Sequence, residues 1–130
     1  MSGFGDSLAV SASGMEAQAR RLRVVSENIA NADTPGYRRK QVSFESRHDS
    51  ASNEGRVSAE KLSLDRSPLP RVYDPTNPMA DGTGYFDGSN VNIIIEMADA
   101  REAQRSYEAN LRMFEQTRQM SQGLLDLLRR

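Results

Sequence analysis

Cysteine and tryptophan are both absent from the 130 residues of this chain, and aromatic residues make up only 6% of it. Without cysteine there is no disulfide, no thiolate ligand for zinc and no thiol nucleophile. Hydrophobic residues reach only 37%, which is below the share of an ordinary globular domain. A chain of this length usually forms one domain around an adequate core. Here the core residues are few, so a compact and self-sufficient globule is not expected.

An excess of either charge is also missing, because 17 lysines and arginines oppose 18 aspartates and glutamates. A net charge of -1 gives no overall field that would hold the protein on nucleic acid or on an anionic membrane. Arg38, Arg39 and Lys40 form a short cationic run, but no nucleic-acid recognition motif surrounds it. The first residues lack a basic segment followed by a long apolar run, so neither a cleaved signal peptide nor a membrane span is expected.

Groups of catalytic or metal-binding residues are equally scarce. His48 is the only histidine and lies in a polar stretch, so no catalytic triad has a plausible centre and His48 is expected at the surface. The segment "DGTGYFDG", residues 81–88, lacks the GK[ST] of a phosphate loop and the carboxylate spacing of a calcium loop. Turn formation explains it better. We therefore expect no catalytic residue, no cofactor and no metal.

Two segments at the ends of the chain show helical periodicity. Between Leu8 and Ala32, large apolar residues recur every seven positions beside smaller ones. This stripe consists of Leu8, Met15, Leu22 and Ile29, with Ala12, Ala19, Val25 and Ala32. From about Val91 to Leu128 a second stripe consists of Ile93, Ala100, Tyr107, Phe114 and Leu128, with Met97, Ala103, Leu111, Leu124 and Leu125. Each stripe is suited to another helix, and we expect Arg20, Arg21 and Arg23 to project outward.

The segment between the helices changes character. "QVSFES", residues 41–46, alternates apolar with polar residues and predicts a short strand. The polar, serine-rich residues 47–61 are expected to be mobile, and residues 69–88, rich in proline and glycine, predict turns with one or two short strands. The predicted fold class is mainly α: two long terminal amphipathic helices packed as a coiled-coil-like pair, with a small irregular β-containing insert. Its parts are residues 1–36, 37–90 and 91–130.

The segment "NIANADTPGYRRK", residues 28–40, lies where the first helix meets the insert. Pro35 and Gly36 fit the two central positions of a type II turn. One interpretation is a simple helix stop followed by a strand. The other interpretation is that the side chains of Asn28 and Asn31 pair with backbone groups of a neighbouring chain. These two residues lie three apart beside the apolar stripe.

Both ends of the chain resemble the bacterial flagellar basal-body rod and hook proteins. "SENIANADTPGYRRK" is similar to the N-terminal signature of this family, and "NVNIIIEMADAREAQRSYEANLRMFEQ" is similar to its C-terminal segment. "RVYDPTNPMADGTGYFDGSNV" and the short chain are most like the proximal-rod members. Those members tend to have proline where this chain has Ser89, and serine is a favourable N-cap for the helix that follows.

The resemblance implies a structural subunit, not an enzyme, that polymerises with other rod proteins and with copies of itself into the drive shaft between motor and hook. It also implies export by the flagellar type III apparatus without a cleaved signal, and a place in the rod of the basal body, in the periplasm. No nucleic acid and no direct membrane insertion are expected. The cations after Tyr37 are expected on the outer or lateral surface. The residues expected at subunit interfaces are Leu22, Asn28, Ile29, Asn31, Pro35, Gly36, Tyr37, Asn90, Val91, Tyr107, Asn110, Leu111, Phe114, Leu124 and Leu128.

Two alternatives use the same features. A soluble helical adaptor or chaperone-like module would bind through the same apolar stripes and form a complex of fixed stoichiometry. The tail "GLLDLLRR", residues 123–130, could lie on a membrane surface, although packing against partner helices explains it more simply.

Overall fold

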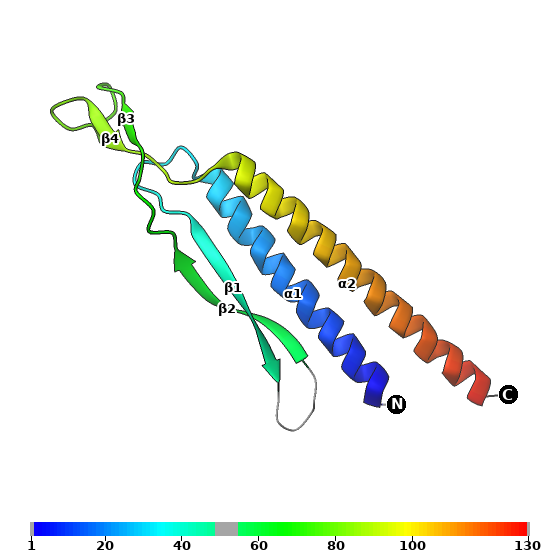
Figure 1. The fold of residues 1–130 in the computed structure, drawn as a ribbon. Helices are drawn as coiled ribbons and strands as arrows, with labels where there is room; N and C mark the ends of the chain where they lie inside the picture. The colour runs from blue at the N-terminus through cyan, green and yellow to red at the C-terminus, as the bar shows by residue number, and fades with distance from the viewer. Residues whose placement is uncertain (1, 49–54, 130) are drawn as a thin grey trace.

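The computed structural model describes residues 2–48 and 55–129 of the chain. Helix α1 spans Ser2–Ala30 and helix α2 spans Ile93–Leu128. Between them lie strands β1 (Lys40–His48), β2 (Gly55–Leu64), β3 (Arg71–Tyr73) and β4 (Tyr85–Asp87). The predicted arrangement of two long terminal helices around a small β-containing insert is confirmed (Figure 1).

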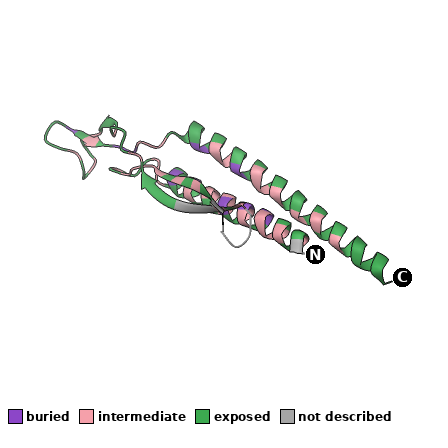
Figure 2. Cartoon of the chain, turned by 60° about the horizontal axis from the view of Figure 1, so that its bottom comes forward, coloured by how far each residue is buried: buried purple, intermediate pink, exposed green. Residues whose placement is uncertain are grey.

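The molecule is an elongated stack in which α1 occupies the middle (Figure 1). The two helices run antiparallel in extensive contact, and the hairpin of β1 and β2 packs along α1. Both chain termini lie at one end, and the β3–β4 hairpin extends from the other end. Because the β1–β2 hairpin packs on α1 and not on α2, α2 carries one face that no other part of the described chain covers along its length (Figure 2).

The helix faces that meet are lined by small and polar residues, whereas the sequence predicted a seam of large apolar residues flanked by small ones. The buried residues of α1 are Ser11, Gly14, Ala17, Val25 and Asn28, and those of α2 are Glu96 and Ala103. Leu8, Met15 and Leu22 are half-buried and Ile29 is exposed, so the seven-residue stripe of α1 lies beside the buried face. The reason is that α1 packs against α2 on one side and against the β1–β2 hairpin on another. Its most buried residues are therefore those that permit close approach.

Helix α2 begins at a different cap from the one expected. Asn92 precedes the helix with an extended backbone, and its side-chain oxygen accepts a hydrogen bond from the amide of Ile94. Ser89 instead accepts from the amide of Val91, before the helix starts. Asparagine and serine are equally good caps, so the sequence alone did not decide between them.

The insert contains more strand than predicted. Strand β1 confirms the expectation for residues 41–46, but β2 occupies residues 55–64 in a region expected to be mobile. Antiparallel pairing with β1, from Lys40 with Leu64 to His48 with Gly55, organises this polar sequence. The register shifts between Ser43 and Phe44, where β2 carries one extra residue. Residues 49–54, part of the same expected mobile stretch, and the side chain of His48 lie outside what the structure describes.

The second hairpin confirms the prediction of turns and short strands. Strands β3 and β4 pair Val72 with Phe86 between turns rich in Asp, Pro and Gly. The carboxylate of Asp81 accepts hydrogen bonds from the hydroxyl and amide of Thr83 and from the amide of Tyr85. Turn formation therefore accounts for "DGTGYFDG".

A close approach between Gly14 and Asn110 fixes the helix pair near its middle. A β-carbon at Gly14 would lie 2.8 Å from both terminal atoms of the Asn110 amide. That amide also donates to the carbonyl oxygen of Ser106, which holds its orientation. Only glycine leaves this space, so the pair sets the register of α1 against α2.

We expect Gly14→Ala to destabilise the helix pair relative to Gly123→Ala, because only the first substitution meets another side chain. Alanine should gain about 1 kcal/mol of helix propensity at either position. In thermal denaturation followed by circular dichroism, Gly123→Ala should raise the midpoint and Gly14→Ala should lower it. Adding Asn110→Ala to Gly14→Ala should restore most of the difference; equal midpoints for the two single variants would contradict the packing described.

Candidate functional site: the junction of the helices and the insert

The chain leaves α1 through a tight turn that was predicted from the Pro-Gly pair. The amide of Tyr37 donates to the carbonyl oxygen of Thr34 at 3.2 Å, and Gly36 has a φ of 75°. This is the geometry of a type II turn, in which the third residue needs a positive φ. The amide of Gly36 also donates to the carbonyl oxygen of Asp87, which ties the turn to β4.

Asn28 is the centre of the junction and is only 1% exposed. Its amide nitrogen donates to the carbonyl oxygen of Lys40 at 2.9 Å and to Oε2 of Glu96 at 3.3 Å. Its amide oxygen accepts from the hydroxyl of Tyr37 at 2.8 Å and from the backbone amide of Lys40 at 2.9 Å. All four hydrogen-bonding positions of the side chain are therefore used. One residue joins α1, the turn, β1 and α2.

Glu96 brings a fully buried carboxylate to the same place. Its Oε1 accepts from Nε of Arg39 in an ion pair, and Arg39 also reaches Asp99 at 3.9 Å. Burying a charge is unfavourable unless it is paired and hydrogen-bonded, and Glu96 has both Arg39 and Asn28. The backbone amide of Arg39 donates to Asn90 at 2.6 Å, and Asn90 donates to the carbonyl oxygen of Asp65, so the insert is held on both sides.

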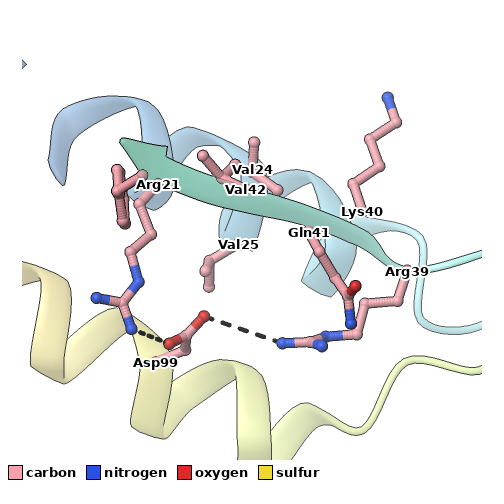
Figure 3. A pocket seen from close by; sticks show the side chains of 9 residues that line it. Arg21, Val24, Val25, Arg39, Lys40, Gln41, Val42 and Asp99 are labelled. Carbon is pink, nitrogen blue, oxygen red and sulfur yellow. Dashed lines mark hydrogen bonds and ion pairs between the residues drawn. The ribbon is translucent and has the colours of Figure 1, made fainter. Parts of the chain in front are cut away.

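A second arginine extends this ion-pair network along the helices. Arg21 on α1 pairs with Asp99 and with Glu102 on α2. Figure 3 shows Arg21 and Arg39 approaching Asp99 from two sides, beneath β1. Burial lowers the pKa of Arg21, but its bonds to Asp99 and Glu102 outweigh this and leave the pKa raised. The cavity beside these groups, of 290 Å³, is lined also by Val25, Val42 and Phe44.

These ion pairs overturn the expectation that Arg21 and Arg39 project into solvent. Their side chains are 16% and 20% exposed and point to carboxylates on α2. The sequence held one signal for this, since Glu96 and Asp99 lie three residues apart on one helix face. That signal became meaningful only when the helices were placed side by side. Lys40 pairs with Glu27 near the surface.

Most of the predicted interface residues fall into two groups. One group works inside the chain: Asn28, Tyr37 and Asn90 form the junction, Asn31 accepts from Thr34 and donates to the carbonyl of Glu27, and Asn110 packs on Gly14. The second interpretation of Asn28, pairing with a neighbouring chain, is not what its bonds show. The other group is apolar and exposed: Ile29, Leu111, Leu124 and Leu128. Leu22, Pro35, Val91, Tyr107 and Phe114 are half-buried.

The junction offers no chemistry of its own. In the described ranges, 2–48 and 55–129, no group of three histidines, aspartates or glutamates could hold a metal ion. Neither α1 nor α2, within those same ranges, combines the length and hydropathy needed to cross a lipid bilayer. What the site does is fix the angle at which the insert leaves the helix pair.

Comparison with known proteins points to one family at both ends. Residues 8–38 match the flagella basal body rod protein family, and residues 83–127 match the C-terminal region of flagellar basal body rod FlgEFG proteins. The flagellar basal-body rod protein FlgC of Agrobacterium fabrum is 51% identical over 92% of this chain and 91% of its own length. The proteins of that name from Bacillus subtilis and Salmonella typhimurium are 38% and 34% identical, over 93% and 91% of this chain.

We expect Asn28→Asp to unfold the junction. The carboxylate cannot donate to Lys40 or Glu96, and it places a second negative charge against a buried one. Unpaired buried charge costs about 3 kcal/mol or more. In urea denaturation at neutral pH the midpoint should fall strongly. The matched control is Asn31→Asp, one turn further and less buried, which should cost less than about 1 kcal/mol; equal losses would show that Asn28 is not the centre.

Proposed function

The chain belongs to the flagellar basal-body rod protein FlgC family, and from this premise we propose that it polymerises through the apolar surface that its own fold leaves uncovered. It is a structural subunit of the proximal rod, not an enzyme, as the sequence predicted. Membership of the family implies assembly with rod proteins. The proposal adds which residues make those contacts.

The observation that carries the proposal is the exposed apolar surface toward the two ends of α2. Ile94 is 79% exposed and Leu128 is 73% exposed, and other exposed large apolar side chains lie in the first two turns of the helix and from Leu111 onward. They include Ile93, Ile95, Met97, Leu111, Met113, Met120, Leu124, Leu125 and Leu127. So many exposed large apolar side chains on one helix mark an interaction site. Each large side chain contributes roughly 1.5 to 3 kcal/mol when it is fully buried.

We assign the interface residues three roles. Leu22, Ile29, Val91, Leu111, Leu124 and Leu128 contact neighbouring subunits, either other rod proteins or copies of this chain. Asn28, Asn31, Pro35, Gly36, Tyr37 and Asn90 act through the geometry of the junction, and Tyr107, Asn110 and Phe114 act through the register of the helices. Subunits held in this way transmit torque from motor to hook because interlocked helices resist twisting together.

The route to the rod is part of the same proposal. Family membership supports export from the cytoplasm through the flagellar type III apparatus, followed by assembly in the periplasmic part of the basal body. Cells that lack the export ATPase of that apparatus should retain the chain in the cytoplasm, where cell fractionation and immunoblotting detect it.

The test of the assembly proposal replaces the apolar tail of α2. A variant with Leu124, Leu125, Leu127 and Leu128 all changed to serine should be produced at normal levels but be absent from purified basal bodies, and the cells should not swim. The reason is that these side chains are 43% to 73% exposed in the subunit and gain burial only from a neighbour.

The matched control changes three exposed polar residues of the same helix segment to serine, namely Arg118, Gln119 and Gln122. Motility assays and immunoblots of basal bodies should be close to normal for this control. Normal rods in the leucine variant would show that the tail of α2 is not a subunit contact. A fixed, soluble complex in the cytoplasm would favour the adaptor interpretation instead.

A further inference from the structure

The β3–β4 hairpin lies at one end of the molecule (Figure 1), where its side chains form an acidic, partly apolar tip. We define the acidic tip as residues 70–88, in which Arg71 opposes Asp74, Asp81 and Asp87, so that its net charge is 1 - 3 = -2. Tyr73 and Met79 are 63% and 67% exposed. The tip therefore presents apolar side chains among negative charges.

The tip has a defined shape because its side chains form ion pairs and ring contacts with one another. Arg71 bridges Asp81 at 2.7 Å and Asp87 at 3.1 Å. The rings of Tyr73 and Tyr85 pack with their centres 5.1 Å apart. Bonds from Thr83 and Arg71 lower the pKa of Asp81, which keeps that carboxylate charged at neutral pH. A preorganised surface loses less entropy when it binds.

A surface groove of opposite charge lies between α1 and the β1–β2 hairpin. We define the basic groove by its lining residues, Arg20, Arg23, Val24, Glu27, Val42, Lys61 and Leu62, which enclose about 330 Å³. Three cations oppose one carboxylate, so the lining carries 3 - 1 = +2, and Glu27 is itself paired with Lys40. Val24, Val42 and Leu62 form its apolar part, and Leu62 is 57% exposed.

We propose that the acidic tip of one copy docks in the basic groove of the next copy. Charges of -2 and +2 are complementary, and both surfaces carry exposed apolar side chains among the charges. This inference rests on the proposed assembly function and specifies one of its contacts.

The contact must be made between copies. The amide of Gly36 donates to the carbonyl oxygen of Asp87, and the amide of Gly88 donates to the carbonyl oxygen of Pro70. These two hydrogen bonds fix the tip beyond the end of α1. The groove lies further along α1, beside β2. Different patches therefore meet in a heterologous contact, which continues from copy to copy around a ring or a helix.

The test uses the absence of cysteine from the chain, because introduced thiols then have no background. One chain carries Pro78→Cys in the tip and a second carries Lys61→Cys in the groove. When both are produced together and basal bodies are mildly oxidised, immunoblots should show an adduct of twice the chain mass. The control pair, Pro78→Cys with Glu108→Cys on the exposed side of α2, should give at least tenfold less adduct.

Charge exchange provides a second arm. Arg23→Glu with Lys61→Glu changes the groove lining from +2 to -2, and incorporation into basal bodies should fall at least tenfold. Pro78→Lys with Gly82→Lys changes the tip from -2 to 0; Gly82 is exposed, and a β-carbon there meets nothing within 4 Å. Combining the two changes removes the repulsion between two negative surfaces and should restore part of the incorporation, which a merely misfolded groove would not allow.

The outcomes separate the inference from the assembly proposal. If the cysteine variants enter basal bodies and no adduct of double mass forms, docking is refuted while assembly stands. An adduct of the groove cysteine with a protein of another mass also refutes it, because another occupant fills the groove. If the unmodified chain itself is absent from basal bodies, both proposals fail.

Discussion

The side chain of Asn28 connects both helices to the start of the insert, because its four hydrogen bonds reach the turn after α1, the start of β1 and the buried carboxylate of α2. An amide suits this position since it donates and accepts at the same time without carrying a charge. Glu96 can be buried only because Arg39 and Asn28 satisfy it. Loss of the amide would therefore leave a buried charge poorly paired and release the insert from the helices.

The polar junction also explains why the large apolar residues face outward. Small and polar residues line the contact between α1 and α2, and among the residues whose burial the structure describes, the buried apolar core is Ala17, Val25 and Ala103. So small a core contributes little hydrophobic free energy compared with the conformational entropy of ordering 130 residues. Ile94, Leu124 and Leu128 on α2 are exposed in the single chain, and burying them in the proposed assembly would add hydrophobic free energy. Under that proposal, folding and polymerisation are coupled.

Sequence periodicity was sufficient to place both helices, the Pro35–Gly36 turn and strand β1, because each depends on neighbouring residues. It failed for β2, whose polar sequence becomes a strand only through pairing with β1. It also assigned Arg21 and Arg39 to the surface, since an arginine is recognised as buried only when its carboxylate partner is known. The stripe of Leu8, Met15 and Leu22 is present but only half-buried. The sequence could not predict this, because it does not show that α1 packs on two sides.

The division between polar and apolar contacts has a mechanical consequence. Hydrogen bonds and paired charges depend on direction and distance, so the junction of Asn28, Arg39 and Glu96 fixes an angle within one subunit. Apolar contact has no such directionality, and its free energy follows the area buried. A rod built from such subunits can be stabilised by apolar faces that tolerate small displacements, while each subunit keeps its own shape. In the assembly proposed above, torque would pass between subunits through a broad apolar contact and within each subunit through a narrow, directional polar one.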